Sequence, residues 1–169
     1  MRRIAILGSG GSGKSTLARQ LGERLGIEVI HLDALYWRPG WVAPPGEEWV
    51  ALQRELVGRD AWVMDGNFGG GRELRLAAAD TIVFLDLPRL LCLWRILWRR
   101  VRDAGRTRPD LAPGCYEGFD WAFTRWVWRY PSETRPKVVA QIAAYAAGRR
   151  VVRLRSARAV REFVAGIGR

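Results

Sequence analysis

Two patterns of apolar residues alternate along the chain. A short continuous apolar run at residues 4–7 is typical of a strand buried on both faces of a parallel sheet, and further short, mainly apolar runs predict strands at residues 27–30, 61–64, 81–85 and 150–154. Between these runs, apolar residues recur at the spacing of a helical face. Helices are expected at residues 15–25, 47–57, 73–79, 88–102, 119–130, 137–147 and 157–164. This alternation predicts an α/β fold: a doubly wound, five-stranded parallel sheet flanked by helices.

The length of 169 residues favours one domain. A segment rich in glycine, proline and charge, near 103–118, is expected to form an exposed, arginine-rich lid. No apolar run is long enough to span a membrane, and the run at the N-terminus is too short for a signal peptide. Two cysteines are too few for a disulfide framework and lack the spacing of a zinc site. A cytoplasmic protein with no membrane partner is predicted.

A glycine-rich sequence joins the first expected strand to the first expected helix. It matches the phosphate-binding pattern G-x-x-x-x-G-K-[ST] in the strand–loop–helix context that the pattern requires, which disfavours a flexible glycine turn that matches by chance. Backbone N–H groups of such a P-loop surround the phosphates of ATP or GTP, and the next helix adds its N-terminal dipole. The nucleotide-binding residues are expected to be Gly8, Ser9, Gly10, Gly11, Ser12, Gly13, Lys14, Ser15 and Thr16.

The chain is strongly basic and uses arginine for almost every cation. Its net charge of +11, from 28 basic and 17 acidic residues, favours polyanionic partners such as nucleic acid, anionic lipid or phosphorylated small molecules. Lys14 and Lys137 are the only lysines. We therefore interpret Lys14 as chemically required, because its ammonium group is expected to reach the β- and γ-phosphates. Ser15 is expected to bind the magnesium ion that bridges the same phosphates.

Three aspartates follow expected strands, at the edge where open parallel sheets bind ligands. Asp65, after the third strand, is expected to bind the magnesium ion or its water ligands. Asp33, after the second strand, is a candidate base for an acceptor hydroxyl, with a structural role in the turn as the alternative. Asp86 is expected to cap the next helix. His31, the only histidine, is expected to be a packed residue beside the turn.

Seven arginines and one carboxylate lie between residues 89 and 108. Arg95, Arg99, Arg102 and Arg106 are spaced four, three and four residues apart, so they share one face wherever the expected helix continues toward the lid. Guanidinium groups that close over a triphosphate would neutralise and orient the transferred phosphoryl group. One alternative is a nucleic-acid-binding patch, because the tryptophans nearby can stack on bases. The other is a solvated helix face with core tryptophans behind it.

Four stretches together resemble adenylate-kinase-related P-loop kinases over nearly the whole chain. They are residues 8–15, 65–66, 79–88 with the arginines that follow, and 151–154. The resemblance implies that Arg95 and Arg99 contact ATP and the transferred phosphate. It also implies that Arg135, with Arg125 or Arg129, is one of the arginines that the family carries on the helix after the lid.

The chain departs from adenylate kinases where those enzymes bind AMP. Gly69 and Tyr36 stand at the two positions where the family has arginines for the AMP phosphate, so AMP is not the expected acceptor. The sequences at 31–37, 65–68 and 114–117 are most similar to bacterial proteins labelled DNA topology modulation proteins. That label names a class of partner without a reaction.

Two hypotheses follow. The first is a phosphotransferase that moves the γ-phosphate of Mg-ATP to a small-molecule acceptor, such as a nucleoside, a nucleotide or another hydroxylated metabolite, with the transferred group stabilised mainly by Lys14 and the arginines. The acceptor would enter between residues 33–41 and 65–71, against an aromatic wall of Tyr36, Trp37, Trp41 and Phe68. The second is an ATP-binding regulatory protein that affects DNA topology through its basic surface, with little or no kinase activity.

Overall fold

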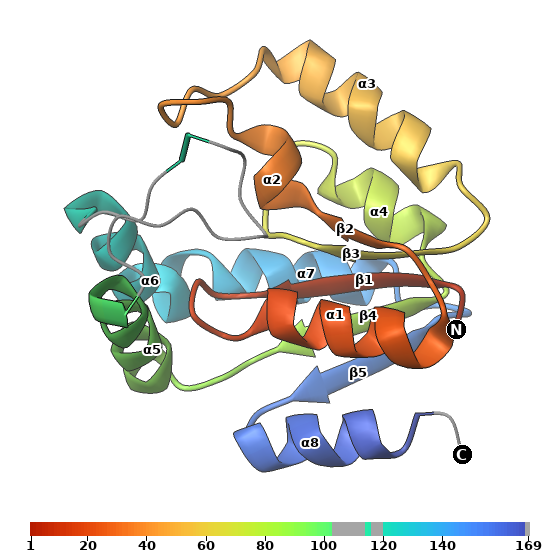
Figure 1. Ribbon diagram of the computed structural model, residues 1–169. Coiled ribbons are helices and arrows are strands. Elements are labelled where there is room, and N and C mark those ends of the chain that lie inside the picture. The colour runs from red at the N-terminus through yellow and green to blue at the C-terminus, as the bar shows by residue number, and fades with distance from the viewer. Residues whose placement is uncertain (103–113, 116–119, 168–169) are drawn as a thin grey trace.

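The computed structural model describes residues 1–102, 114–115 and 120–167 (Figure 1). In these ranges, five parallel strands form one sheet in the order β2-β3-β1-β4-β5. The strands are β1 (Arg3–Gly8), β2 (Val29–His31), β3 (Trp62–Asp65), β4 (Thr81–Leu85) and β5 (Arg150–Leu154). The predicted α/β fold with a five-stranded parallel sheet is therefore confirmed.

Helices cover both faces of the sheet (Figure 1). They are α1 (Lys14–Leu25), α2 (Leu32–Tyr36), α3 (Gly46–Val57), α4 (Arg72–Ala78), α5 (Arg89–Arg102), α6 (Trp121–Glu133), α7 (Arg135–Ala144) and α8 (Ala157–Ala165). Successive side chains of β1 point to opposite faces. Ile4 and Ile6 pack in a core with α1 and α8, whereas Ala5 and Leu7 pack in a second core with α3, α4 and α7.

The parallel register brings the carboxyl ends of the strands to one edge of the sheet. Ile6 of β1 pairs with Asp65 of β3, which also pairs with His31 of β2. On the other side of β1, Gly8 pairs with Leu85 of β4. The P-loop and the residues that follow β2, β3 and β4 therefore meet at this edge.

Helices α5 and α6 pack together beside the P-loop (Figure 1). Two glycines of the loop allow this close approach. A Cβ atom at Gly10 would lie 2.5 Å from the Phe123 ring of α6, and one at Gly11 would lie 2.3 Å from the Cys92 carbonyl oxygen of α5. Any larger residue at these positions would separate the P-loop from the two helices.

Three helices differ most from the sequence expectation. α2 follows β2 directly, where only a turn was expected, because its five residues are too few to show a helical pattern. α6 continues through Pro131 to its end at Glu133; the proline removes one backbone donor, and the rest of the helix persists. α7 begins and ends earlier than expected, at Arg135 and Ala144.

Of the lid expected near 103–118, the structure describes Gly114 and Cys115; the remainder, with Arg106 and Arg108, lies outside the described residues. The Cys115 thiol donates to the Arg38 carbonyl at 3.3 Å, and the Gly114 carbonyl accepts from the backbone before α3. This part of the segment therefore contacts the loop after α2. Within the described ranges, no helix combines the length and apolar character needed to cross a bilayer.

Candidate functional site

The glycine-rich loop after β1 curls into a cradle of backbone groups. Gly11 and Gly13 have φ values of 72° and 93°, in the left-handed region that residues with a Cβ atom rarely adopt. The Ser12 N–H donates to the Ser9 carbonyl at 3.2 Å, and α1 begins at Lys14. The N-terminus of the twelve-residue helix α1 therefore points into the space that the loop encloses. This is the geometry of a phosphate-binding loop.

Lys14 folds back over the loop. Its ammonium group donates to the Ser9 carbonyl at 3.0 Å. Burial lowers the pKa of Lys14, and the charges of Asp33 and Asp65 oppose that effect, while Arg99 adds to it. An anion bound in the loop would favour the charged ammonium group, as phosphate binding requires.

Asp65 is buried at the centre of the site and contacts two side chains. The Ser15 hydroxyl donates to Asp65 Oδ2 at 2.7 Å, and His31 Nδ1 lies 2.5 Å from Oδ1. A hydroxyl and a carboxylate oxygen in contact are suitable ligands for magnesium that also binds phosphates, so Ser15 and Asp65 fit the magnesium site expected from the sequence. The sequence analysis did not predict the contact between His31 and Asp65. Strand register could have found it, because His31 and Asp65 pair as the last residues of β2 and β3.

Asp33 lies in the first turn of α2, just beyond β2. Burial lowers the pKa values of Lys14 and Arg75, and the negative charge of Asp33 opposes that effect at both groups, so its carboxylate lies near both cations. The structure therefore brings Asp33 to the same edge of the sheet as the P-loop. Its role as a proton acceptor stays a prediction.

Three arginines of α5 have different surroundings. Arg95 Nη1 donates to the Ser12 carbonyl of the P-loop at 3.3 Å. Arg99 is close enough to lower the pKa of the P-loop lysine. Arg100 Nη1 instead donates to the Thr124 hydroxyl at 2.9 Å, which joins α5 to α6. The structure therefore brings Arg95 and Arg99 to the P-loop and gives Arg100 a contact between helices.

Arg135, at the start of α7, forms a two-point ion pair with Asp86. Its Nε and Nη2 donate to the two carboxylate oxygens at 2.8 and 3.2 Å, and Arg153 Nε donates to one of them at 2.8 Å. Burial alone would raise the pKa of Asp86, but the hydrogen bonds from both arginines outweigh burial and lower it. The expectation that Asp86 caps the next helix is corrected: two nearby guanidinium groups take its oxygens.

The aromatic side chains expected at the acceptor entrance lie together. The ring centroids of Tyr36 and Phe68 are 4.2 Å apart, those of Tyr36 and Trp37 are 4.8 Å apart, and Trp41 contacts Trp37. Trp49 of α3, which the sequence analysis did not name, is buried behind them and packs on Tyr36 and Phe68. The rings therefore form one cluster that spans α2, α3 and the loop after β3.

Two arginines of α4 are buried beneath the loop after β3. Arg75 is 1% exposed and donates to the carbonyls of Gly66 and Phe68 at 3.0 and 2.7 Å. Arg72 donates to the carbonyl of Asn67 at 2.6 Å. Burial lowers the pKa of Arg75 to about 9, which leaves the guanidinium group protonated at neutral pH. The sequence analysis missed both residues, because a polar residue in a short helix is normally exposed.

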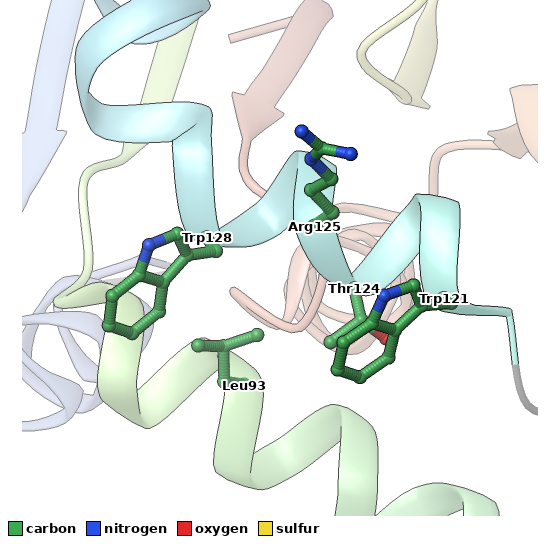
Figure 2. Close-up of a pocket in the computed structure, with 5 residues that line it drawn as sticks. All are labelled: Leu93, Trp121, Thr124, Arg125 and Trp128. Atoms are coloured by element: carbon green, nitrogen blue, oxygen red, sulfur yellow. The ribbon is translucent and has the colours of Figure 1, made fainter.

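A separate feature lies on the outer side of α5 and α6. A cavity of about 380 Å³ is lined by Leu93, Trp121, Thr124, Arg125 and Trp128. Figure 2 shows Trp121 and Trp128 on the side of α6 that faces Leu93, with Arg125 pointing away from it. Exposed apolar side chains continue this surface, which we call the tryptophan face: Leu90, Trp94, Leu97, Trp98, Val101, Trp121 and Trp128. No P-loop residue lines the cavity.

No protein-family model matches the chain. It is 28% identical over 106 residues to the uncharacterized protein YqaC of Bacillus subtilis (strain 168), a match that covers 62% of this chain and 60% of that protein. Similar solved structures include a shikimate kinase from Acinetobacter baumannii, with a TM-score of 0.59, 20% identity and coverage of 99% of this chain and 90% of that one. A gluconokinase from Sinorhizobium meliloti 1021 gives a TM-score of 0.55, 19% identity and coverage of 98% and 91%. The chain therefore has the α/β fold of P-loop kinases.

Proposed function

We propose that this chain is a magnesium-dependent phosphotransferase that moves the γ-phosphoryl group of ATP to a hydroxyl group of a small-molecule acceptor. The observation that carries the proposal is the grouping of Lys14, Ser15 and Asp65 around one glycine-rich loop, with the Ser15 hydroxyl 2.7 Å from the carboxylate of Asp65. The fold shared with structures named as shikimate kinase and gluconokinase supports it.

The proposed reaction is an in-line displacement. The acceptor oxygen attacks the γ-phosphorus, the bond from that phosphorus to the β–γ bridging oxygen breaks, and ADP leaves. Asp33 takes the proton of the attacking hydroxyl. Lys14, Arg95 and Arg99 neutralise the charge on the transferred group, and Arg135 extends that positive charge from α7. Ser15 and Asp65 would hold the magnesium ion, which would neutralise part of the charge of the phosphates.

Label transfer from radiolabelled ATP tests the proposal. The wild type is incubated with magnesium and a panel of nucleosides, nucleotides and hydroxylated metabolites, and transfer is followed beside release to water. We expect Lys14→Ala to reduce transfer about 10²–10³-fold, because a preorganised cation is lost. Lys137→Ala is the matched control, since the other lysine is exposed on α7. A folded Lys14→Ala protein with unchanged turnover would reject the mechanism.

Nucleic-acid binding is a second candidate function, favoured by the tryptophan face. α5 carries no acidic residue, and the Arg89 guanidinium lies 4.1 Å from the centre of the Trp128 ring. Exposed indole rings can stack on bases while arginines neutralise phosphates, which is how an ATP-binding regulator of DNA topology would use this surface.

A titration with single-stranded DNA tests this candidate. Binding should weaken steeply between about 50 and 200 mM salt, because each neutralised phosphate releases a counterion. The double variant Trp94→Ala/Trp98→Ala should lose affinity, whereas Trp41→Ala, at an exposed tryptophan outside this face, should keep it. No binding at low salt would remove this candidate.

A further inference from the structure

The tryptophan face contains a stripe of exposed apolar side chains along α5. The members of the stripe are Leu90, Trp94, Leu97, Trp98 and Val101. They recur every three or four residues, so they lie on one side of the helix, and their exposed fractions lie between 46% and 77%. Trp121 and Trp128 of α6 extend the same surface (Figure 2). A contiguous apolar surface of this kind marks an interaction site.

The area of this face is large enough for a stable protein interface. Its four tryptophans are between 47% and 69% exposed. At up to about 250 Å² for a whole tryptophan side chain, they present roughly 600 Å² per chain. The three aliphatic side chains add to that area. Since a standard interface buries about 800 Å² per partner, the face can supply one protomer's share of a dimer interface.

Most arginines of α5 point toward their own chain. Arg95 donates to a carbonyl of the P-loop, and Arg99 is close enough to the P-loop lysine to lower its pKa. Arg100 donates to the Thr124 hydroxyl and to the backbone at the start of α6. A polyanion on the tryptophan face would therefore meet few of these cations. The aliphatic members of the stripe also have no ring that could stack on a base.

The stripe is nearly the same when α5 is read in either direction. Leu90 and Val101 lie at its two ends, and Trp94 and Trp98 lie on either side of its middle. In an antiparallel pair of α5 helices, the Leu90 end of one chain meets the Val101 end of the other, and the tryptophans meet at the centre. An interface between identical chains with two-fold symmetry requires this self-complementarity. The cavity between α5 and α6 gives room for side chains of the second copy.

Charge opposes the pairing of two copies, and salt should reduce that opposition. Each chain has a net charge of +11, and α5 carries no acidic residue. Arginine and tryptophan are enriched in protein interfaces, from which lysine and acidic residues are depleted, so the composition of the face fits a protein partner. The Debye length falls from about 10 Å at 0.1 M salt to about 3 Å at 1 M. Pairing should therefore strengthen with salt, whereas binding to a polyanion weakens.

We propose that two copies of this chain form a symmetric dimer through their tryptophan faces, with the two α5 helices antiparallel. The proposal does not depend on the phosphotransferase activity. Helices α5 and α6 pack on the P-loop at Gly11 and Gly10, so the dimer would also support the two helices that flank each nucleotide site.

Sedimentation equilibrium of the full-length wild type tests the proposal. The molar mass is measured from about 1 to 100 μM protein, at about 0.1 and 0.5 M salt. We expect a transition from monomer to dimer that moves to lower protein concentration at the higher salt. A monomer at every concentration would overturn the proposal, and so would a dimer that dissociates when salt is added.

The variant Leu97→Arg separates pairing from polyanion binding. Leu97 lies near the middle of the stripe, so the two new charges would lie close together and the dimer Kd should rise about 100-fold. The same charge would strengthen binding to single-stranded DNA or to phosphatidylglycerol vesicles. Val42→Arg, at an exposed residue outside this face, is the control and should pair like the wild type. Circular dichroism checks that each variant is folded.

The outcomes distinguish the possible occupants of the face. A folded Leu97→Arg protein that pairs like the wild type would overturn the proposal. A monomeric wild type that binds DNA or the vesicles, with Leu97→Arg binding more tightly, would also overturn it and assign the face to a polyanion. If Leu97→Arg does not fold, the salt dependence of the wild type decides.

Discussion

The proposed nucleotide end and the proposed acceptor end of the site are built from different chemical groups. At the proposed nucleotide end, the groups are side chains. Lys14 and Ser15 belong to one motif, and Asp65, at the end of the neighbouring strand β3, accepts a hydrogen bond from the Ser15 hydroxyl. At the proposed acceptor end, Arg72 and Arg75 donate hydrogen bonds to the backbone carbonyl groups of the loop after β3. A motif reveals the first arrangement but not the second, because every residue type supplies a backbone carbonyl group.

The largest effect is expected from Asp65→Asn, at the nucleotide end. The change keeps the size of the side chain but removes the charge that Ser15 and magnesium need, so transfer should fall about 10²–10³-fold. The measurement is kcat at increasing magnesium concentration, with Asp60→Asn as the control at an exposed aspartate before β3. A wild-type kcat in Asp65→Asn would show that this carboxylate does not hold the metal.

At the acceptor end, Arg75→Lys separates charge from geometry. A lysine keeps the positive charge, but its single ammonium group cannot hold two carbonyls with the fixed fork of a guanidinium group. The acceptor KM should rise about tenfold, with the ATP KM unchanged, as expected for the loss of a charged hydrogen bond. Arg54→Lys, at an exposed arginine of α3, is the control. Equal increases in both KM values would mean that the two ends are not independent.

The sequence predicted the bounds of β4 and β5 exactly and those of β2 least well. β4 was predicted with its exact bounds, Thr81–Leu85, because all five residues are buried between helix layers and form an uninterrupted apolar run. β2 is an edge strand of three residues that begins at Val29, two residues later than expected. The expected run at 27–30 contains the exposed, charged Glu28, so its apolar residues do not define the ends of the strand.

The same distinction applies to the site. Lys14 and Ser15 could be named because the spacing of the P-loop is fixed by the phosphates that it binds. The contact between His31 and Asp65 depends on strand register, which the sequence alone did not supply. The burial of Arg75 could not be predicted, because the carbonyls that accept its hydrogen bonds leave no trace in residue type.

A smaller effect, on stability, is expected from Asp86→Asn. The change removes a carboxylate that binds Arg135 and Arg153, and should cost about 1–3 kcal/mol of unfolding free energy near neutral pH. The pKa of Asp86 is lowered in the folded state, so its contribution is present above the unfolded pKa of about 3.9 and is lost as the pH falls through the folded pKa. Denaturation at neutral and acidic pH should therefore show the two proteins converging in acid. A constant difference would exclude this ion pair as the cause.

The smallest effect is expected from Trp49→Phe, again at the acceptor end. Trp49 Nε1 donates to the Gly70 carbonyl at 3.1 Å, but Gln53 donates to the same oxygen at 2.6 Å, so the carbonyl keeps a partner when the indole is lost. Phenylalanine also retains much of the ring contact, and the loss should be about 0.5–1.5 kcal/mol of unfolding free energy, with little change in acceptor KM. The double variant with Gln53→Leu leaves the carbonyl without either partner and should lose more than the sum of the single changes. If Trp49→Phe alone raised the acceptor KM as much as Arg75→Lys, the loop would depend on its aromatic neighbour as strongly as on the arginines beneath it.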